Sequence, residues 1–498
     1  MSRSHEKAGK MDEKFDNSNI GVSALTGTVE SIDTNGPEAR KVLRKIDCHL
    51  LPILAVTYFI QFLDKSCVSY AALWGMREDA HLEGSQYSWL TTMFYIGYLV
   101  SEFPINVLFQ KFDIARTCGI FIILWGIVLL CMTAAHDFAG LATARFFLGA
   151  LEAGVSPCFV LLTAMFYKRS EQPFRTSLWF SMNGMANILG GLLGYAIGFI
   201  DADIPTWKFP FVIFGSLTIV WGIIFLFITP SNPTTAKWLT QEEKAIAVMR
   251  LAENETGIDN KQWKWYQVKE AVMDPRFWLL NLLALANNIP NGGVSAFGPL
   301  IVHGFGYSQF QSTLLNMPSG AAQIMALWTS GFLATRLKGA RHFLMLGGIC
   351  VAIVGASLIY AMPDDQKVPR LLGYYLLVGF SVVWVLALTF VQANVAGRTK
   401  KTIFASSVFV SYCLGNIIGP QLFFSYEAPR YQSGFAAMIV CFCVQILLVT
   451  AMYFLNWREN IRRDRLATGA NDVDRDVDVA LGLSDLTDKE NLHFRYVL

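Results

Sequence analysis

Long apolar runs alternate with short polar turns over most of the chain. Five of the clearest runs are Thr117–Ala135, Phe209–Thr229, Phe343–Pro363, Leu371–Gly397 and Tyr431–Asn456. A helix of about 20 apolar residues crosses a lipid bilayer, so each run is long enough to do so. The pattern predicts about twelve spans, near residues 48–72, 86–110, 117–136, 140–167, 174–200, 209–229, 277–302, 309–335, 342–362, 370–394, 401–425 and 431–456.

A long polar loop divides the predicted spans into two sets of six. The expected organisation is a disordered tail at 1–45, a first six-helix half at 46–229, a central loop at 230–276, a second half at 277–456 and a tail at 457–498. Within the loop, Thr240 and Glu243 have the spacing of a capping box. They predict a short amphipathic helix there.

Composition agrees with an all-α membrane protein. The 498 residues are 53% hydrophobic and only 16% charged, whereas a soluble chain of this length carries far more charge. The nine cysteines show neither metal-ligand nor disulfide spacing and are expected to pack as small apolar residues, so no metal or cofactor is expected. No nucleophile–base pair, metal cluster or phosphate loop suggests an enzyme, and no basic face suggests nucleic-acid binding.

Lysine and arginine are unevenly shared between the two sides of the predicted bundle. An even number of spans puts both termini on one side. The short loops on that side hold Lys111, Arg116, Lys168, Arg169, Arg175, Arg336, Lys338, Arg341, Arg398, Lys400 and Lys401, against Arg77, Lys208, Lys367, Arg370 and Arg430 opposite. The positive-inside rule therefore predicts cytosolic termini and a cytosolic central loop. Asn254 has the spacing of a glycosylation site but falls in that loop.

The fourth predicted span carries two charges well inside its ends. Arg145 and Glu152 are seven residues apart, which places them on one helix face about 10.5 Å apart. Charges at membrane depth usually face a bundle interior or a water-filled cavity. Two interpretations remain open: a structural pair neutralised by other helices, or a site for substrate and proton.

The other charges inside the spans also belong to the first half. Asp64, Lys65 and Glu102 join Arg145 and Glu152 there. We expect Asp64 to face the cavity and pair with Arg145. Lys65 is close enough to the outer surface for its stem to reach the headgroups, which is the alternative to a substrate contact. Glu102 is expected to link helices or gate loops.

The second-half spans carry amides and hydroxyls in place of charges. Among them, Asn287, Asn291, Tyr412 and Asn416 are the candidates for binding a polar substrate through neutral hydrogen bonds. One half is therefore suited to charge and proton exchange, and the other to orienting a substrate. Protonation of a carboxylate would favour the entry of an anion, which is a physical route to coupling anion and proton.

Proline and glycine are concentrated in the seventh and eleventh spans. Pro290 with its neighbouring glycines should interrupt the helical hydrogen bonds of the seventh span, and Gly415, Gly419 and Pro420 should do the same in the eleventh. A gating kink is one interpretation of these residues. Plain close packing of helices is the other.

The layout resembles the major facilitator superfamily over about residues 45–460. Short basic turns recur at equivalent places in the two halves, at 106–116 and 331–341. Six-plus-six spans around a central cavity are the architecture of that superfamily. The resemblance implies transport by alternating access.

More specific motifs resemble the anion:cation symporters, and within them the fungal allantoate permease family. They are Asp64-Lys65 in the first span, Arg145-x6-Glu152, Glu102-Phe-Pro104, Asn287-Asn-Ile-Pro-Asn-Gly-Gly293, and Ser411-Tyr-Cys-Leu-Gly-Asn-Ile-Ile-Gly-Pro-Gln421. The resemblance implies that Asp64 and Glu152 exchange protons and that Lys65 and Arg145 contact a substrate carboxylate. It also implies plasma-membrane uptake of acids such as allantoate, nicotinate, pantothenate or biotin.

The sequence thus predicts proton-coupled uptake of a small organic anion by a monomer in the bilayer. Glu152 is the leading candidate for the coupled proton. A proton-driven exporter of a metabolite or drug-like compound is the main alternative. A membrane sensor that transports nothing is a remote alternative, because the chain lacks the large cytosolic domain that a sensor would need.

Overall fold

The computed structural model describes residues 36–168, 171–200, 203–252, 264–337, 339–467, 487–491 and 494–498. Within these ranges the regular structure is entirely helical. Most of the first predicted tail, half of the second, and Asn254 lie outside the described residues.

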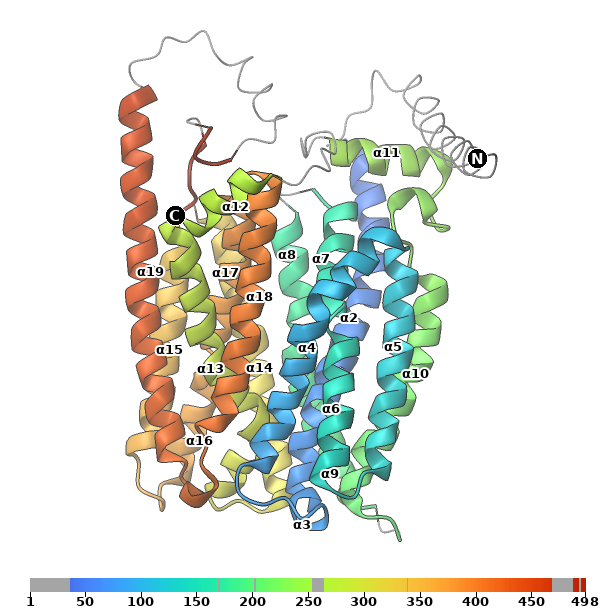
Figure 1. Ribbon diagram of the computed structural model, residues 1–498, viewed down its shortest axis with the longest axis vertical. Coiled ribbons are helices and arrows are strands. Elements are labelled where there is room, and N and C mark those ends of the chain that lie inside the picture. Colours follow the sequence, from blue (N-terminus) through green and yellow to red (C-terminus); the bar gives the residue numbers. More distant parts are fainter. Residues whose placement is uncertain are drawn as a thin grey trace, which may run out of the picture.

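The helices form two groups that stand side by side (Figure 1). The first group consists of α2 (Pro37–Leu73), α3 (Met76–Asp79), α4 (Gln86–Lys111), α5 (Ile114–Cys131), α6 (Phe138–Glu152), α7 (Val155–Phe166), α8 (Gln172–Phe180), α9 (Met182–Ile197) and α10 (Phe209–Ile228). The second group consists of α13 (Pro275–Gly304), α14 (Gln309–Arg336), α15 (Arg341–Ala361), α16 (Lys367–Leu377), α17 (Phe380–Asn394), α18 (Arg398–Gln421) and α19 (Gln432–Ala467).

Two shorter helices from the central loop lie at one end of the bundle. They are α11 (Gln241–Ala252) and α12 (Trp265–Val272), and α3 lies at the opposite end. We call these the α12 end and the α3 end. The start of α2, the end of α19 and the chain's C-terminus are all at the α12 end (Figure 1).

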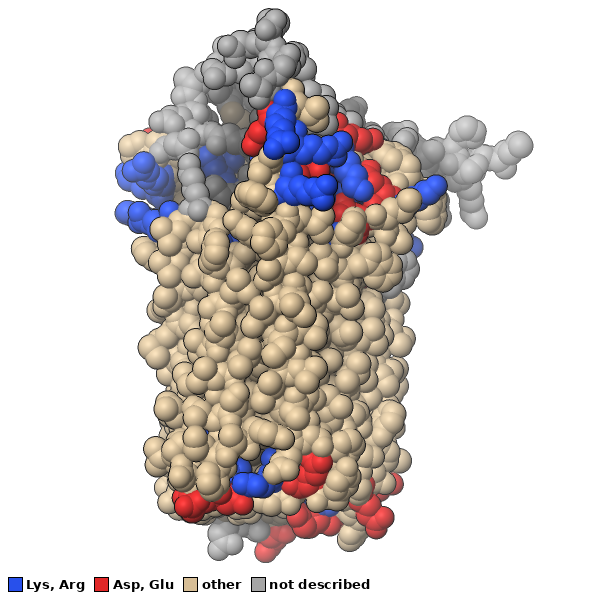
Figure 2. Space-filling model, turned by 90° about the vertical axis from the view of Figure 1, so that its left-hand side faces the viewer, with Lys and Arg blue, Asp and Glu red and all other residues tan. Residues whose placement is uncertain are grey.

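Eight helical segments of the described chain are long and apolar enough to cross a membrane. They are Pro37–Leu73, Ile114–Ala134, Phe138–Phe166, Thr206–Ile228, Arg341–Ala361, Lys367–Val391, Thr399–Gln421 and Gln432–Leu466. The predicted spans at α4, α8–α9, α13 and α14 are helical but are not among these eight. Figure 2 shows Lys and Arg gathered at the upper end and a broad uncharged band below them, as a bilayer requires.

Several predicted spans differ in detail from the helices. The span at 140–167 is divided into α6 and α7 at Ala153 and Gly154, and that at 174–200 into α8 and α9 at Ser181. By contrast, α13 continues through Pro290 and Pro299, and α18 continues through Gly415, Gly419 and Pro420, so these residues do not end either helix. A proline removes one hydrogen bond, and the neighbouring helices hold the rest of the helix in place.

The glycines of the seventh and eleventh predicted spans bring α13 and α18 into close contact. A Cβ added to Gly292 would lie 2.8 Å from Cα of Asn416, and one added to Gly415 would lie 2.7 Å from Cβ of Asn288. At Gly419 an added Cβ would collide with the backbone oxygen of Ile289. Small residues allow this approach, so close packing accounts for these glycines.

The central loop divides between the two groups. The capping box predicted for α11 is confirmed: the Thr240 amide donates to Glu243 Oε2 at 2.8 Å, and the Glu243 amide donates to Thr240 Oγ1 at 3.3 Å. Glu243 also forms an ion pair of 2.6 Å with Lys45 on α2, which joins α11 to the first group. Lys400 on α18 binds Glu270 at 2.9 Å, which joins α12 to the second.

Candidate functional site

A cavity of about 360 Å³ lies between the two groups. Side chains of α2, α4 and α6–α9 line one side, and those of α13, α14 and α16–α18 line the other. A cavity at the junction of two helical halves is where secondary transporters bind their substrates.

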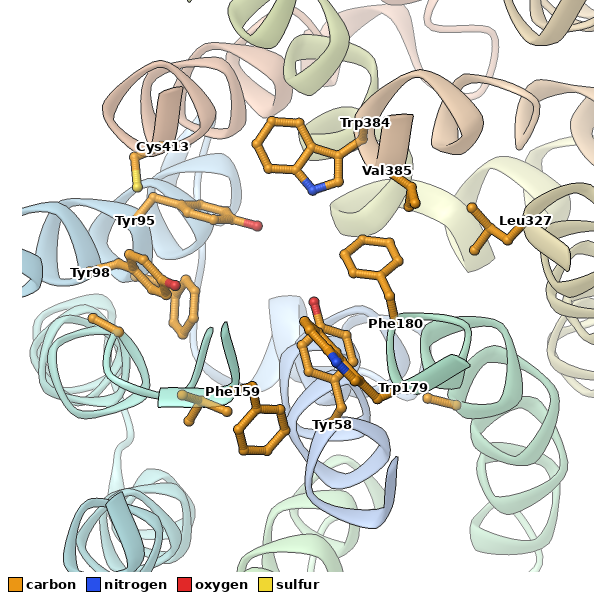
Figure 3. Packing of buried hydrophobic residues seen from close by; sticks show 14 of the residues in the cluster. Tyr58, Tyr95, Tyr98, Phe159, Trp179, Phe180, Leu327, Trp384, Val385 and Cys413 are labelled. Atoms are coloured by element: carbon orange, nitrogen blue, oxygen red, sulfur yellow. The ribbon is translucent and has the colours of Figure 1, made fainter. Parts of the chain in front are cut away.

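Aromatic rings from both groups surround this space. Figure 3 shows the rings of Tyr58, Tyr95, Phe180 and Trp384 directed toward a common hollow. Tyr412 bridges the two groups, because its ring centroid lies 5.9 Å from that of Tyr95 and 5.1 Å from that of Trp384. These rings bury apolar area, while the tyrosine hydroxyls and the Trp384 indole N–H remain able to form hydrogen bonds.

Arg145 brings a positive charge to the cavity wall. Its side chain lines the cavity, its residue is only 3% exposed, and its guanidinium carbon lies 5.7 Å above the Phe94 ring. No described side chain or backbone group accepts a hydrogen bond from it or forms an ion pair with it, and its Nε is buried without a partner. A buried arginine of this kind is suited to a carboxylate, which its planar fork can bind with two parallel hydrogen bonds.

The close packing of α6 against α4 fixes the position of Arg145. Asp137 caps α6 by accepting a hydrogen bond of 2.9 Å from the Gly140 amide. A Cβ added to Gly149 would collide with the backbone oxygen of Phe94, so the two helices are in direct backbone contact. The face of α6 that carries Arg145 is thereby directed into the cavity.

Lys65 and Glu152 form an ion pair beside the cavity. Lys65 Nζ lies 2.8 Å from Glu152 Oε1, and the Glu152 side chain is fully buried whereas that of Lys65 is 21% exposed. Lys65 lines the cavity, and its Nζ lies 5.5 Å from the centroid of the Phe94 ring. No basic residue lies one turn from Glu152 on its own helix, and its partner comes from α2.

Asp64 does not face the cavity or pair with Arg145, so both expectations are wrong. Its buried Oδ2 accepts hydrogen bonds from Trp125 Nε1 at 2.7 Å and from Thr218 Oγ1 at 2.8 Å. These partners belong to α5 and α10, on the side of α2 away from the second group. Consecutive residues of a helix are about 100° apart, so Asp64 and Lys65 point in different directions.

Glu102 lies on α4 outside the cavity lining. The residue is 8% exposed, and its Oε2 is buried without a hydrogen-bond partner among the described residues. It is therefore not part of an ion pair between helices among the described residues.

The second group contributes amides to the site. Asn287, Asn291 and Tyr412 line the cavity, whereas Asn416 is fully buried behind it. Asn291 Nδ2 donates to Asn416 Oδ1 at 2.9 Å, and Asn416 Nδ2 donates to the Tyr412 backbone oxygen at 2.9 Å. Asn287 is 1% exposed, and both of its amide atoms are without a partner in the described chain. Asn287 therefore has a free donor and a free acceptor for a substrate.

Hydrogen bonds between the two groups close the cavity toward the α3 end. Tyr87 Oη donates to the Ala296 oxygen at 2.7 Å, Ser88 Oγ donates to the Pro420 oxygen at 3.0 Å, and Gln421 Nε2 donates to Thr92 Oγ1 at 2.9 Å. Pro420 therefore acts through its carbonyl at this closure.

The lining continues in the other direction, toward the α12 end. Thr176 on α8 and Lys401 on α18 both belong to it. Apart from Pro420 and Tyr412, which the sequence singled out, sequence reasoning missed the residues of the closure and the aromatic wall. Their only signal was a polar or aromatic residue within an apolar run.

Comparisons with known proteins agree with this architecture. The sequence model of the Major Facilitator Superfamily matches residues 54–420. Allantoate permease of Saccharomyces cerevisiae is 35% identical over 488 residues, covering 95% of this chain and 89% of that protein. An uncharacterized transporter of Schizosaccharomyces pombe is 39% identical over 466 residues, covering 92% and 87%.

A more distant relative and a solved structure complete the comparison. A thiamine pathway transporter of Saccharomyces cerevisiae is 32% identical over 459 residues, covering 92% of this chain and 86% of that protein. The crystal structure of a bacterial homologue of the human lysosomal transporter Spinster matches with a TM-score of 0.59 and 16% identity, covering 82% of this chain and 97% of that one.

Proposed function

The chain belongs to the major facilitator superfamily, and from its cavity we propose that it is a secondary active transporter that carries a small organic anion together with protons. The substrate is a carboxylate of the size of allantoate or nicotinate. It reaches the cavity alternately from the two sides of the membrane.

Arg145 is the observation that supports this proposal best. It is a buried cation in the cavity wall without an acceptor among the described residues, whereas the charge of Lys65 is balanced by Glu152 at 2.8 Å. A substrate carboxylate supplies the missing acceptor. The amide of Asn287 and the ring of Tyr412 on the opposite wall orient the rest of the molecule.

Glu152 carries the coupled proton in this mechanism. When its carboxylate is protonated, Lys65 loses its counter-charge and is free to bind the anion alongside Arg145. Release of the proton restores the ion pair and displaces the anion. Asp64 has a supporting role at most, because two donors hold its carboxylate on the other side of α2.

The same proposal includes the arrangement in the membrane. Twelve spans cross the plasma membrane of a monomer: the eight apolar helical segments together with α4, α8–α9, α13 and α14. Both termini, α11 and α12 are in the cytosol, as the bias of lysine and arginine toward that side requires. The cavity lining that reaches Lys401 then leads to the cytosol.

The experiment uses sealed vesicles that contain the purified protein, with labelled allantoate and nicotinate as probes. Arg145→Lys keeps the charge but not the fork, so the apparent affinity should fall, and Arg145→Ala should abolish uptake. Arg116→Lys, at an exposed position on α5, is the matched control. Normal transport by well-expressed Arg145→Ala would exclude the carboxylate role.

The coupling role of Glu152 is tested in the same vesicles with an imposed pH gradient. Glu152→Gln should still exchange labelled for unlabelled anion but should no longer accumulate it against a gradient. If Glu152→Gln still accumulated the anion as the wild type does, another carboxylate would carry the coupled proton. Accumulation driven by an opposite pH gradient in the wild type would favour export over uptake.

A further inference from the structure

The last residues of the chain pack against the α12 end of the second group. We call residues 487–491 and 494–498 the C-terminal peptide. Its contacts reach α12 and, in the second group, α13, α17, α18 and α19. None of these contacts belongs to the transport cavity described above.

Asp488 supplies the first anchor. Its Oδ1 lies 2.6 Å from Lys400 Nζ on α18, and both side chains are buried. Lys400 is also 2.9 Å from Glu270 and 3.3 Å from Asp274. The lysine thus joins the peptide to α12 and α13, and charge-assisted hydrogen bonds of this kind are strong.

Tyr496 supplies the second anchor. Its hydroxyl donates to Asp488 Oδ2 at 2.7 Å and accepts hydrogen bonds from Arg276 Nη1 at 3.1 Å and Arg463 Nη2 at 3.2 Å. The Arg276 guanidinium also lies 3.8 Å from the centroid of its ring. Burial raises the pKa of the Tyr496 hydroxyl above its usual range, which keeps the donated proton in place.

The peptide backbone is held as well. The Val497 amide donates to Asn394 Oδ1 at 2.6 Å, and Asn394 Nδ2 donates back to the Val497 oxygen at 3.0 Å. The Tyr496 amide donates to Asn460 Oδ1 at 2.9 Å. Because these side-chain amides form hydrogen bonds with backbone groups of the peptide, they fix its register.

The charged residues that bind the peptide keep partners without it. Lys400 retains Glu270 and Asp274, and Arg463 retains Glu459, whose Oε1 accepts from its Nε at 3.0 Å. Removal of one partner from a buried ion pair is costly mainly when it leaves a charge uncompensated. Removal of the peptide leaves none of these charges uncompensated, so docking can be reversible.

We propose that the α12 end of the second group is a docking site for the chain's own C-terminal peptide, which binds it reversibly through Asp488 and Tyr496. Docking joins α12, α13, α17, α18 and α19 at one end. It also fixes the first turn of α18, where Lys401 next to Lys400 lines the cavity. The docked and released peptide therefore give two states of the cavity mouth.

Thr487 makes the docking sensitive to added negative charge. The residue is fully buried, its hydroxyl donates to Glu270 Oε2 at 3.0 Å, and its neighbours Asp488 and Glu490 are acidic. A phosphate on this hydroxyl would be buried among carboxylates and would repel them. Phosphorylation of Thr487 is therefore incompatible with the docked state.

The test uses the purified protein truncated after residue 486 and a fluorescent synthetic peptide of residues 483–498. Fluorescence anisotropy should report saturable binding. The same peptide with Asp488→Asn should bind about tenfold more weakly, because it loses a hydrogen bond between charged groups. A peptide with phosphothreonine at 487 should not bind measurably. Equal binding of all three peptides, or no binding of the first, would overturn the proposal.

If the truncated chain does not purify as a folded protein, a second measurement tests the same proposal on the full chain. The full chain with Asp488→Asn is compared with the wild type by hydrogen exchange. Faster exchange in 265–276 and 394–402 is expected, with no change in α5 on the other group. Unchanged exchange in those two segments would show that the peptide does not hold them, and would overturn the proposal. Neither measurement requires transport, so the proposed function is tested separately.

Discussion

The ion pair between Lys65 and Glu152 can be separated into a structural and a functional contribution by a double substitution. Lys65→Met removes the positive charge and leaves Glu152 fully buried without its counter-ion. Lys65→Met with Glu152→Gln removes both charges at nearly constant volume. We expect the single variant to be clearly destabilised and the double variant to recover most of the lost stability.

The magnitude follows from the geometry of the pair. At 2.8 Å the attraction between unit charges is about 6 kcal/mol for an effective dielectric constant of about 20. Desolvation offsets much of that attraction, and removal of one partner from a buried pair costs about 3–5 kcal/mol. Because the Lys65 side chain is 21% exposed, we expect about 3 kcal/mol for Lys65→Met. Replacement of both charges is expected to be nearly neutral.

The assay is thermal unfolding of the purified variants in detergent, followed by transport in vesicles. Lys65→Met should lower the Tm by several degrees, and the double variant should approach the wild type. Lys41→Met, at an exposed position on α2, is the matched control and should leave the Tm unchanged. A double variant no more stable than Lys65→Met would refute the electrostatic reasoning. If the double variant were stable and still accumulated substrate, the ion pair between Lys65 and Glu152 would have a structural role only.

The other predictions concern the helix contacts that surround the cavity. In a variant with Thr92→Cys and Gln421→Cys, linking the two cysteines with a short bifunctional reagent should stop transport, because these side chains must separate when the cavity opens toward the α3 end. Continued transport by the linked protein would contradict this. Gly419→Val should lower the Tm through a collision with the α13 backbone, whereas an unchanged Tm would show that the helices can move apart. Hydrogen bonds from Lys45 and from the Thr240 amide lower the pKa of Glu243 below its ordinary value of 4.5. The Glu243 carboxylate therefore contributes its full stabilisation above pH 4.5, and this contribution is lost as the pH falls through the lowered pKa. Hydrogen exchange of residues 241–252 should then accelerate in acid for the wild type but not for Glu243→Gln.

The sequence was sufficient for the helical architecture because apolar periodicity is a local property. Runs such as Phe209–Thr229 needed no tertiary information, and α10 occupies Phe209–Ile228. The capping box at Thr240 was equally local, and α11 begins directly after it. Prediction was weaker where the conformation of a segment depends on the helices packed against it. Pro290 sits inside a continuous helix, since α18 and α19 pack against α13 along its length.

The charges show the same limit more sharply. Burial of Asp64, Arg145 and Glu152 could be expected, because a charge inside an apolar run has few other places to go. Their partners could not be identified, because a partner depends on which helices are neighbours and how each is rotated. Asp64 and Lys65 are adjacent in sequence, yet one binds Trp125 and the other binds Glu152.

The division of the central loop suggests how the two groups move relative to each other. On one side of residues 253–263, α11 is bound to the first group through Glu243 and through Arg250, which lies 2.6 Å from Glu171 next to α8. On the other side, α12 is bound to the second group through Lys400. Each group therefore carries its own short helix, and the described ion pairs at the α12 end lie within a group. In the proposed transport cycle, opening toward the α3 end breaks neutral hydrogen bonds between the groups, such as that between Ser88 and Pro420, while the ion pairs of the α12 end stay intact. That distribution of strong and weak contacts favours a rocking motion of two rigid groups over a rearrangement within either one.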